Sequence, residues 1–400
     1  MKKLFLISAV SAGLFTSCVQ NEQIVPEQKV SDPAIKFQTV VAKQGTRAII
    51  TGTEYGASAP SFGSYGFINP DNLLPGSQGY IRNAEIVYRP ANGATAAYWG
   101  TPEGQTPYKW PKEGSVTFYA YSPYYCQETD HADQPLNPTA PEIGSHGFIF
   151  SNYDVDAHQQ TDLMVADIKY GLTANQTNDI YVGVPTIFKH KLAMIGGFIL
   201  TTSQDYDGLW DGENNSSAKK GDMRFKIRKI ELKNIPTIGT FTSEGINGTN
   251  GDIIPEKWTD PTVAQVKKNY VWYNNADGVE FGHVDSKKLH IYLTTTETKY
   301  HKNPTIANGY LLVKPQQFLS GSDASLEITY TIGTFNGVSW DLTGDVITKE
   351  ILLKDIHAGT ADLGWGINKK LVYTLDFSTT EIRWAPSVLE WDAEDIKVDY

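Results

Sequence analysis

The stretch A-I-K-F-Q-T-V-V-A-K-Q-G-T-R-A, residues 34–48, decides how this chain folds. Every second side chain in its first half falls on one face, which consists of Ile35, Phe37, Thr39 and Val41. A period of two residues is typical of a half-buried β-strand. The stretch therefore predicts the first strand of the folded chain.

The same stretch ends in a bond that a protease can cut. Gly45 and Thr46 stop the alternation, and Arg47 follows with the small residue Ala48 behind it. An accessible arginine at a loop tip suits an arginine-specific protease. Two interpretations stay open. The first is an ordinary first strand; the second is a strand, within residues 34–47, that completes a sheet and is later removed, leaving an apolar groove for another chain.

Composition indicates a β-rich chain that can fill large cores. The 400 residues suit two domains, and they include 9 Trp, 22 Tyr and 16 Phe. The 35 Gly and 20 Pro are typical of many short strands joined by turns. The formal net charge of −11 argues against nucleic acid as a partner, because phosphate backbones require clustered Lys and Arg.

Residues 1–17 have the features of a lipoprotein signal peptide. Lys2 and Lys3 form a basic start, and the apolar segment that follows is too short to span a bilayer as a stable helix. L-F-T-S-C at residues 14–18 resembles a bacterial lipobox, so Cys18 is expected to carry lipid, such as palmitate, that anchors the precursor in the outer membrane. Residues 18–33 are polar and are expected to form a tether.

The sequence offers no catalytic or metal-binding pattern, and no cofactor is expected. None of the eight histidines stands in an H-x-x-x-H or H-E-x-x-H pattern. The spacing of His283 and His290 does not bring two imidazoles to one metal on a strand. With Cys18 lipidated, Cys126 is the one remaining cysteine, so thiolates build neither a zinc site nor an intrachain disulfide.

Short alternating runs in two groups predict an all-β chain of two tandem β-sandwiches. The expected domains are residues 34–186 and 187–400. Two strands are expected to carry bulges, one at Gly196 and Gly197 and one within residues 225–232, where the apolar face changes partway. The only helix-like stretch is short and lies near residues 262–273.

The C-terminal part also alternates. Its apolar residues are Ile382, Trp384, Val388, Ile396, Val398 and Tyr400. Donated to a neighbouring chain, such a strand would form a ladder of main-chain hydrogen bonds and bury its apolar face. The alternative is that it folds back into its own domain.

The order of several motifs resembles the fimbrillin family, the lipoprotein-derived type V pilins. These motifs are I-K-F at residues 35–37, T-R-A at 46–48, W-P-K-E-G-S-V-T-F-Y-A-Y-S-P-Y from residue 110, F-K-H-K-L at 188–192, L-L-V-K-P-Q at 311–316, K-L-V-Y-T-L at 370–375, I-R-W at 382–384 and W-D at 391–392. The resemblance implies two transthyretin-like sandwiches, export as a lipoprotein, cleavage after Arg47 and polymerisation by strand exchange.

Two functions of different kinds follow. The first is a structural subunit of a cell-surface fimbrium that polymerises with other subunits and supports adhesion. The second is a lipid-anchored or tip adhesin that binds a glycan or a host protein without polymerising. An enzyme is not expected.

Overall fold

Nearly every element of this chain is a β-strand, so the all-β prediction is confirmed. The computed structural model describes residues 34–41, 60–68, 79–93, 96–125, 141–144, 147–157, 161–174, 183–202, 221, 223–246, 252–281, 289–291, 310–341, 343–358, 363–377 and 382–390. Within these ranges the one helix is α1 (Leu353–Ile356), a single turn. Alternating apolar residues, rather than helical periodicity, therefore control the fold.

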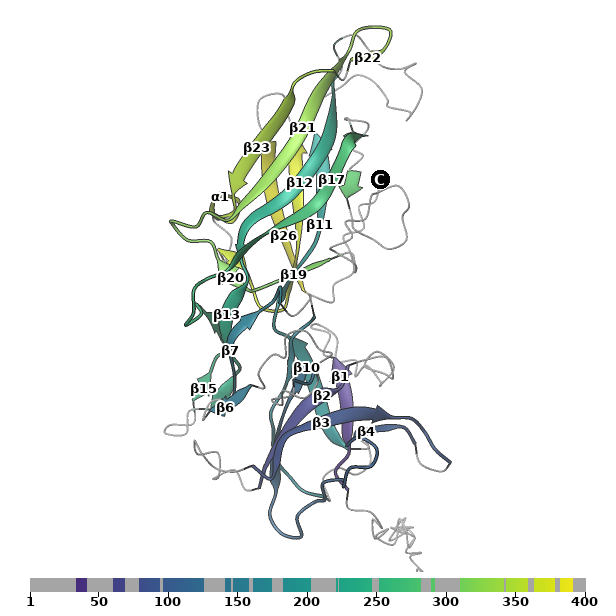
Figure 1. Ribbon diagram of the computed structural model, residues 1–400, viewed down its shortest axis with the longest axis vertical. Helices are drawn as coiled ribbons and strands as arrows, with labels where there is room; N and C mark the ends of the chain where they lie inside the picture. Colours follow the sequence, from purple (N-terminus) through teal and green to yellow (C-terminus); the bar gives the residue numbers. More distant parts are fainter. Residues whose placement is uncertain are drawn as a thin grey trace, which may run out of the picture. The chain divides into compact units, whose positions relative to one another are not determined.

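The first half of the chain builds an eight-stranded sheet around β1. Its strands, in spatial order, are β2 (Phe62–Ile68), β3 (Ile81–Arg89), β4 (Tyr98–Gly100), β1 (Phe37–Val41), β10 (Val184–His190), β8 (Met164–Ala166), β5 (Val116–Ser122) and β9 (Lys169–Leu172). Because β2 also pairs with β5, all of these strands except β9 form a closed ring. Figure 1 labels β1, β2, β3, β4 and β10 among its members. β1 is one of the strands of this ring and lies between β4 and β10.

Aromatic and aliphatic side chains fill the interior of the ring. The buried members of this core are Ile35, Phe37, Phe62, Ile81, Ile86, Trp99, Val116, Phe118, Ala120, Met164, Ala166, Val184 and Phe188. In β5, Val116, Phe118 and Ala120 point inward while Tyr119 and Tyr121 join a second cluster on the other side. All seven residues of β5 are buried, because successive side chains point to opposite faces and each face meets a core.

The second half of the chain is a β-sandwich. One sheet holds β18 (Leu289–Ile291), β11 (Ala193–Thr202), β25 (Lys369–Phe377), β26 (Ile382–Glu390) and β19 (Leu311–Val313). The other holds β17 (Lys267–Phe281), β12 (Met223–Pro236), β21 (Ser325–Phe335), β22 (Trp340–Asp341) and β23 (Val346–Leu352). The two sheets share one core, in which Phe198 of β11 meets Trp272 of β17 with ring centroids 5.2 Å apart.

Smaller pairings join elements from both halves of the sequence. Strands β16 (Lys257–Thr259), β13 (Ile238–Thr242), β7 (Gly147–Asp154) and β6 (Glu142–Gly144) form one sheet. β14 (Gly245–Ile246) pairs with β15 (Ile253–Ile254), and β20 (Gln316–Gln317) pairs with β24 (Gly364–Trp365). The expected boundary at residues 186 and 187 falls inside β10, which stays in the first sheet as far as His190. The division into two domains stays a prediction.

Local irregularities agree with the sequence in two places and differ in one. Both expected bulges are confirmed, because the register shifts between Ile195 and Gly197 in β11 and between Ile227 and Lys229 in β12. The helix-like interpretation of residues 262–273 is wrong, since this stretch leads into the long strand β17. Tertiary pairing with β12 overrides the local pattern there.

Candidate functional site: the seat of strand β1

The main chain of β1 is held on both sides. It runs parallel to β10 from the pair Phe37–Val184 to the pair Val41–Phe188, and it meets β4 at the single antiparallel pair Phe37–Trp99. Val184 donates its N–H to the carbonyl of Lys36 at 2.7 Å. The β4 side of the seat is therefore far less continuous than the β10 side.

The side chains that the sequence places on the buried face of β1 do point into the ring. Ile35, Phe37 and Thr39 are 5%, 3% and 1% exposed. Phe37 presents its ring edge-on to Phe62 and Phe118, with centroid separations of 5.6 and 5.8 Å. The backbone of Val41 belongs to β1, and its side chain lies outside the described part of the structure.

A glycine allows the close approach of β1 to the segment before β10. Gly183 has φ +149°, and a Cβ added there would lie 2.5 Å from the carbonyl oxygen of Lys36. Any other residue at this position would therefore be strained and would push β1 away from the start of β10. The sequence gives Gly183 no special mark, because G-V-P is an ordinary turn signal.

Removal of β1 would leave a groove with two free sheet edges. Closed rings have no unpaired edges, whereas an open ring exposes the N–H and C=O groups of β10 and β4. Ile35 and Phe37 each bury apolar surface worth roughly 1.5–3 kcal/mol. The exposed groove, lined by rings such as Phe62, Phe118 and Phe188, would thus favour refilling by a strand of matching pattern.

The structure describes only some of the other residues that the sequence predicts as sites. Cys18, Arg47 and Ala48 lie outside the described residues, as do Ile396, Val398 and Tyr400. Ile382, Trp384 and Val388 belong to β26, which pairs antiparallel with β25 from Phe377–Ile382 to Lys369–Glu390. Ile382 is 4% exposed in the core of its own sandwich. In this chain residues 382–390 are folded back.

Two general findings complete the description of the site. None of the helices in the described ranges is both long and apolar enough to cross a membrane. In those same ranges, no three side chains of His, Cys, Asp or Glu are grouped so that they could hold a metal ion.

The sequence of the chain matches the model of a known protein family. The model of the Fimbrillin-like family matches residues 46–343, which is more than half of the 400 residues. The chain therefore belongs to the Fimbrillin-like family, which consists of structural fimbrial proteins and is not an enzyme family. The matched range begins after β1. A search of curated proteins finds no match.

One solved structure shares the fold of this chain, and two more distant ones are also similar to it. A fimbrial protein from Bacteroides vulgatus is 15% identical with a TM-score of 0.52, over 90% of this chain and 99% of its own. A fimbrial assembly protein from Parabacteroides distasonis is 8% identical with a TM-score of 0.34, over 89% and 98% of the two chains. The fimbrial anchor protein Mfa2 from Porphyromonas gingivalis is 11% identical with a TM-score of 0.29, over 90% and 97%.

Proposed function

We propose that this chain is a structural subunit of a cell-surface fimbrium and polymerises by strand exchange. It is exported as a lipoprotein, anchored through Cys18 in the outer membrane, and cut after Arg47 by an arginine-specific protease. Loss of residues 34–47 opens the ring, and a strand from a neighbouring subunit takes the place of β1. The subunit then supports adhesion from an extracellular fimbrium.

The observation that carries this proposal is the position of β1 as a member of a closed ring. Its backbone pairs with β10 and β4, and its apolar side chains lie in the core. In the sequence, Arg47 follows the last residue of β1 by six positions. Because β1 is part of the core and lies close in sequence to a bond that an arginine-specific protease can cleave, we infer that it fills the ring only until cleavage.

The incoming strand is proposed to come from the C-terminus. Residues 382–390 are paired with β25, and their release would break that ladder. Ile396, Val398 and Tyr400 follow the end of β26 and keep the alternating pattern that the groove requires. Residues 391–400 are therefore the favoured donor, and β26 stays in its own sandwich. Subunits joined head to tail in this way form open filaments.

The test is to treat the lipidated full-length chain with an arginine-specific protease. We expect the wild-type chain to yield a free N-terminus at Ala48 and then a ladder of oligomers that resists SDS. The variant Arg47→Gln should remain uncut at this bond and should not form the ladder. Arg82→Gln, which removes an exposed arginine of β3, is the matched control and should behave as wild type.

The opposite outcomes support the second function. A chain that is cut after Arg47 and stays monomeric would point to a tip adhesin, and a chain that resists cutting at Arg47 would point to a lipid-anchored adhesin. Either would bind a glycan or host protein without polymerising. N-terminal sequencing of the surface form separates the two products, because a lipidated chain has a blocked Cys18 and a processed chain starts at Ala48.

A further inference from the structure

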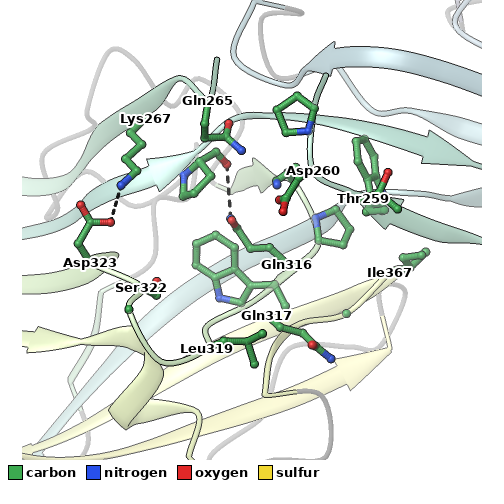
Figure 2. Close-up of a pocket in the computed structure, with 18 of the residues that line it drawn as sticks. Thr259, Asp260, Gln265, Lys267, Gln316, Gln317, Leu319, Ser322, Asp323 and Ile367 are labelled. Carbon is green, nitrogen blue, oxygen red and sulfur yellow. Dashed lines mark hydrogen bonds and ion pairs between the residues drawn. The ribbon is translucent and has the colours of Figure 1, made fainter. Parts of the chain in front are cut away.

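The molecule also has a surface hollow, which is separate from the seat of β1. It has a volume of about 1090 Å³ and is lined by the end of β12, the start of β17 and the segments around β16, β20 and β24 (Figure 2). Its lining includes Lys314, Pro315 and Gln316 from the motif L-L-V-K-P-Q. The proposed exchange of β1 does not involve this motif.

Lys314 lines this hollow, and its amine has no direct partner in the described part of the chain. The residue is only 5% exposed, and its stem crosses Gly239, where an added Cβ would lie 2.7 Å from Cδ of Lys314. Among the residues that the structure describes, none forms a hydrogen bond or ion pair with its ammonium. Burial lowers the pKa of Lys314, and the negative charge of Asp260 opposes that shift.

The other charged groups that line the hollow, Lys267, Asp323 and Asp260, do not form an ion pair with Lys314. Lys267 and Asp323 form their own ion pair at 2.6 Å on one side of the hollow, as Figure 2 shows. Asp260 acts on Lys314 through its charge, without an ion pair at contact distance. Burying a cation is unfavourable unless an anion pairs with it, and an incoming carboxylate would provide that partner.

The remaining lining suits a saccharide better than a peptide strand. Gln317, Ser320 and Ser322 bring polar side chains, while Leu319 and Val263 expose 56% and 51% of their surface beside them. A pyranose ring presents hydroxyl groups on its edge and C–H groups on its faces, which matches such a mixed lining. A peptide strand would require free main-chain groups, and at β20 these are paired with β24.

We propose that this hollow binds the carboxylate of an acidic saccharide, with Lys314 as its ion-pair partner. Gln317 and the two serines would bind hydroxyl groups, and Leu319 and Val263 would lie against the ring. This inference rests on the adhesive part of the proposed function, because it names the class of ligand that the fimbrium would recognise. Strand exchange plays no part in the binding step.

The test uses the full chain, uncut and monomeric, titrated with sodium glucuronate by calorimetry. Methyl glucoside is the neutral probe, and an Asp-rich peptide is the acidic peptide probe. We expect glucuronate to bind, and Lys314→Met to weaken this binding roughly 10- to 100-fold, which corresponds to the loss of one charge-assisted contact. Lys349→Met, which removes an exposed lysine outside the hollow, is the matched control and should bind as wild type.

Thermal unfolding separates a binding role of Lys314 from a structural one. Because the ammonium of this largely buried lysine has no ion-pair partner among the described residues, Lys314→Met should unfold at the same temperature as wild type or higher. A lower unfolding temperature would make Lys314 a structural residue and would overturn the proposal. Equal binding of methyl glucoside, binding of the peptide alone, or no binding of glucuronate would each overturn it too. None of these results bears on the SDS-resistant ladder, which tests assembly separately.

Discussion

At the scale of single residues, Phe37 links the sequence pattern to the seat of β1. It is 3% exposed and lies edge-on against Phe62 and Phe118. Edge-to-face aromatic pairs contribute about 0.5–1.5 kcal/mol beyond the area that they bury. Phe37 therefore tests whether β1 belongs to the core of the uncut chain.

We predict that Phe37→Ala lowers the free energy of unfolding of the uncut chain by about 3–5 kcal/mol, because it leaves a cavity among aromatic rings. Denaturation in urea measures this change. Gln38→Ala, at the half-buried neighbouring position on the opposite face, should change stability by less than about 1 kcal/mol. Equal effects of the two substitutions would show that β1 is not packed in the ring.

His357 gives the stability of the sandwich a dependence on pH. It is 1% exposed, and its Nε2 lies 2.9 Å from the hydroxyl oxygen of Tyr373. Burial lowers the pKa of His357 from 6.5 to about 4. Burial also raises the pKa of Tyr373, so that hydroxyl stays neutral in this range.

The sign of the effect follows from which state binds the proton. Below pH 6.5 the unfolded chain protonates His357, whereas the folded chain does not do so until about pH 4. We predict that the contribution of His357 is complete above pH 6.5 and falls by about 3 kcal/mol as the pH drops to about 4. Urea denaturation of wild type and His357→Gln across this range measures it. Parallel pH profiles of the two proteins would contradict the prediction.

At the scale of elements, the sequence indicates the strands and their bulges but not their partners. The paired glycines at residues 196 and 197 indicate a bulge because they weaken a regular strand. Residues 262–273 are misleading, because β17 owes its form to pairing with β12 rather than to its own pattern. No local signal shows that β1 would run parallel to β10, since that pairing joins residues far apart in the chain.

Gly183 provides a test of the junction between β1 and β10. We predict that Gly183→Ala destabilises β1 in its seat, because a Cβ would meet the carbonyl oxygen of Lys36 at 2.5 Å. Hydrogen exchange of the β1 amides should accelerate in this variant. The control is Gly93→Ala, at φ +57° with nothing within 4 Å of its Cβ, which also replaces a glycine of positive φ but should leave β1 protected. Protection of β1 in both variants would argue against close contact at Gly183.

At the scale of the whole molecule, the ring makes the removal of one strand consequential. A chain that begins at Ala48 lacks one member of the ring, and the cluster around Phe62 and Phe118 loses its cover. An exposed apolar groove between two free strand edges favours association. Under the proposed function, the seat of β1 is therefore the part of the molecule where cleavage of the chain would change its oligomeric state.

A peptide supplied in trans tests this idea directly. We predict that a chain starting at Ala48 binds the dye ANS and forms oligomers, and that a peptide of residues 34–47 suppresses both by refilling the groove. The same peptide with Phe37→Ala should be much less effective, because it lacks the ring that packs against Phe62. If the two peptides acted equally, the groove would not recognise the buried face of β1.

The sequence by itself determined the class of this protein. Alternation over residues such as Ile35, Phe37 and Thr39 identifies strands and their buried face because the backbone turns successive side chains to opposite sides. Only the tertiary structure decided that β1 closes a ring between β4 and β10, that residues 382–390 fold back on β25, and that Lys314 faces a hollow without an ion-pair partner among the described residues. These features arise from contacts between distant segments, and a local pattern carries no information about which distant segments meet.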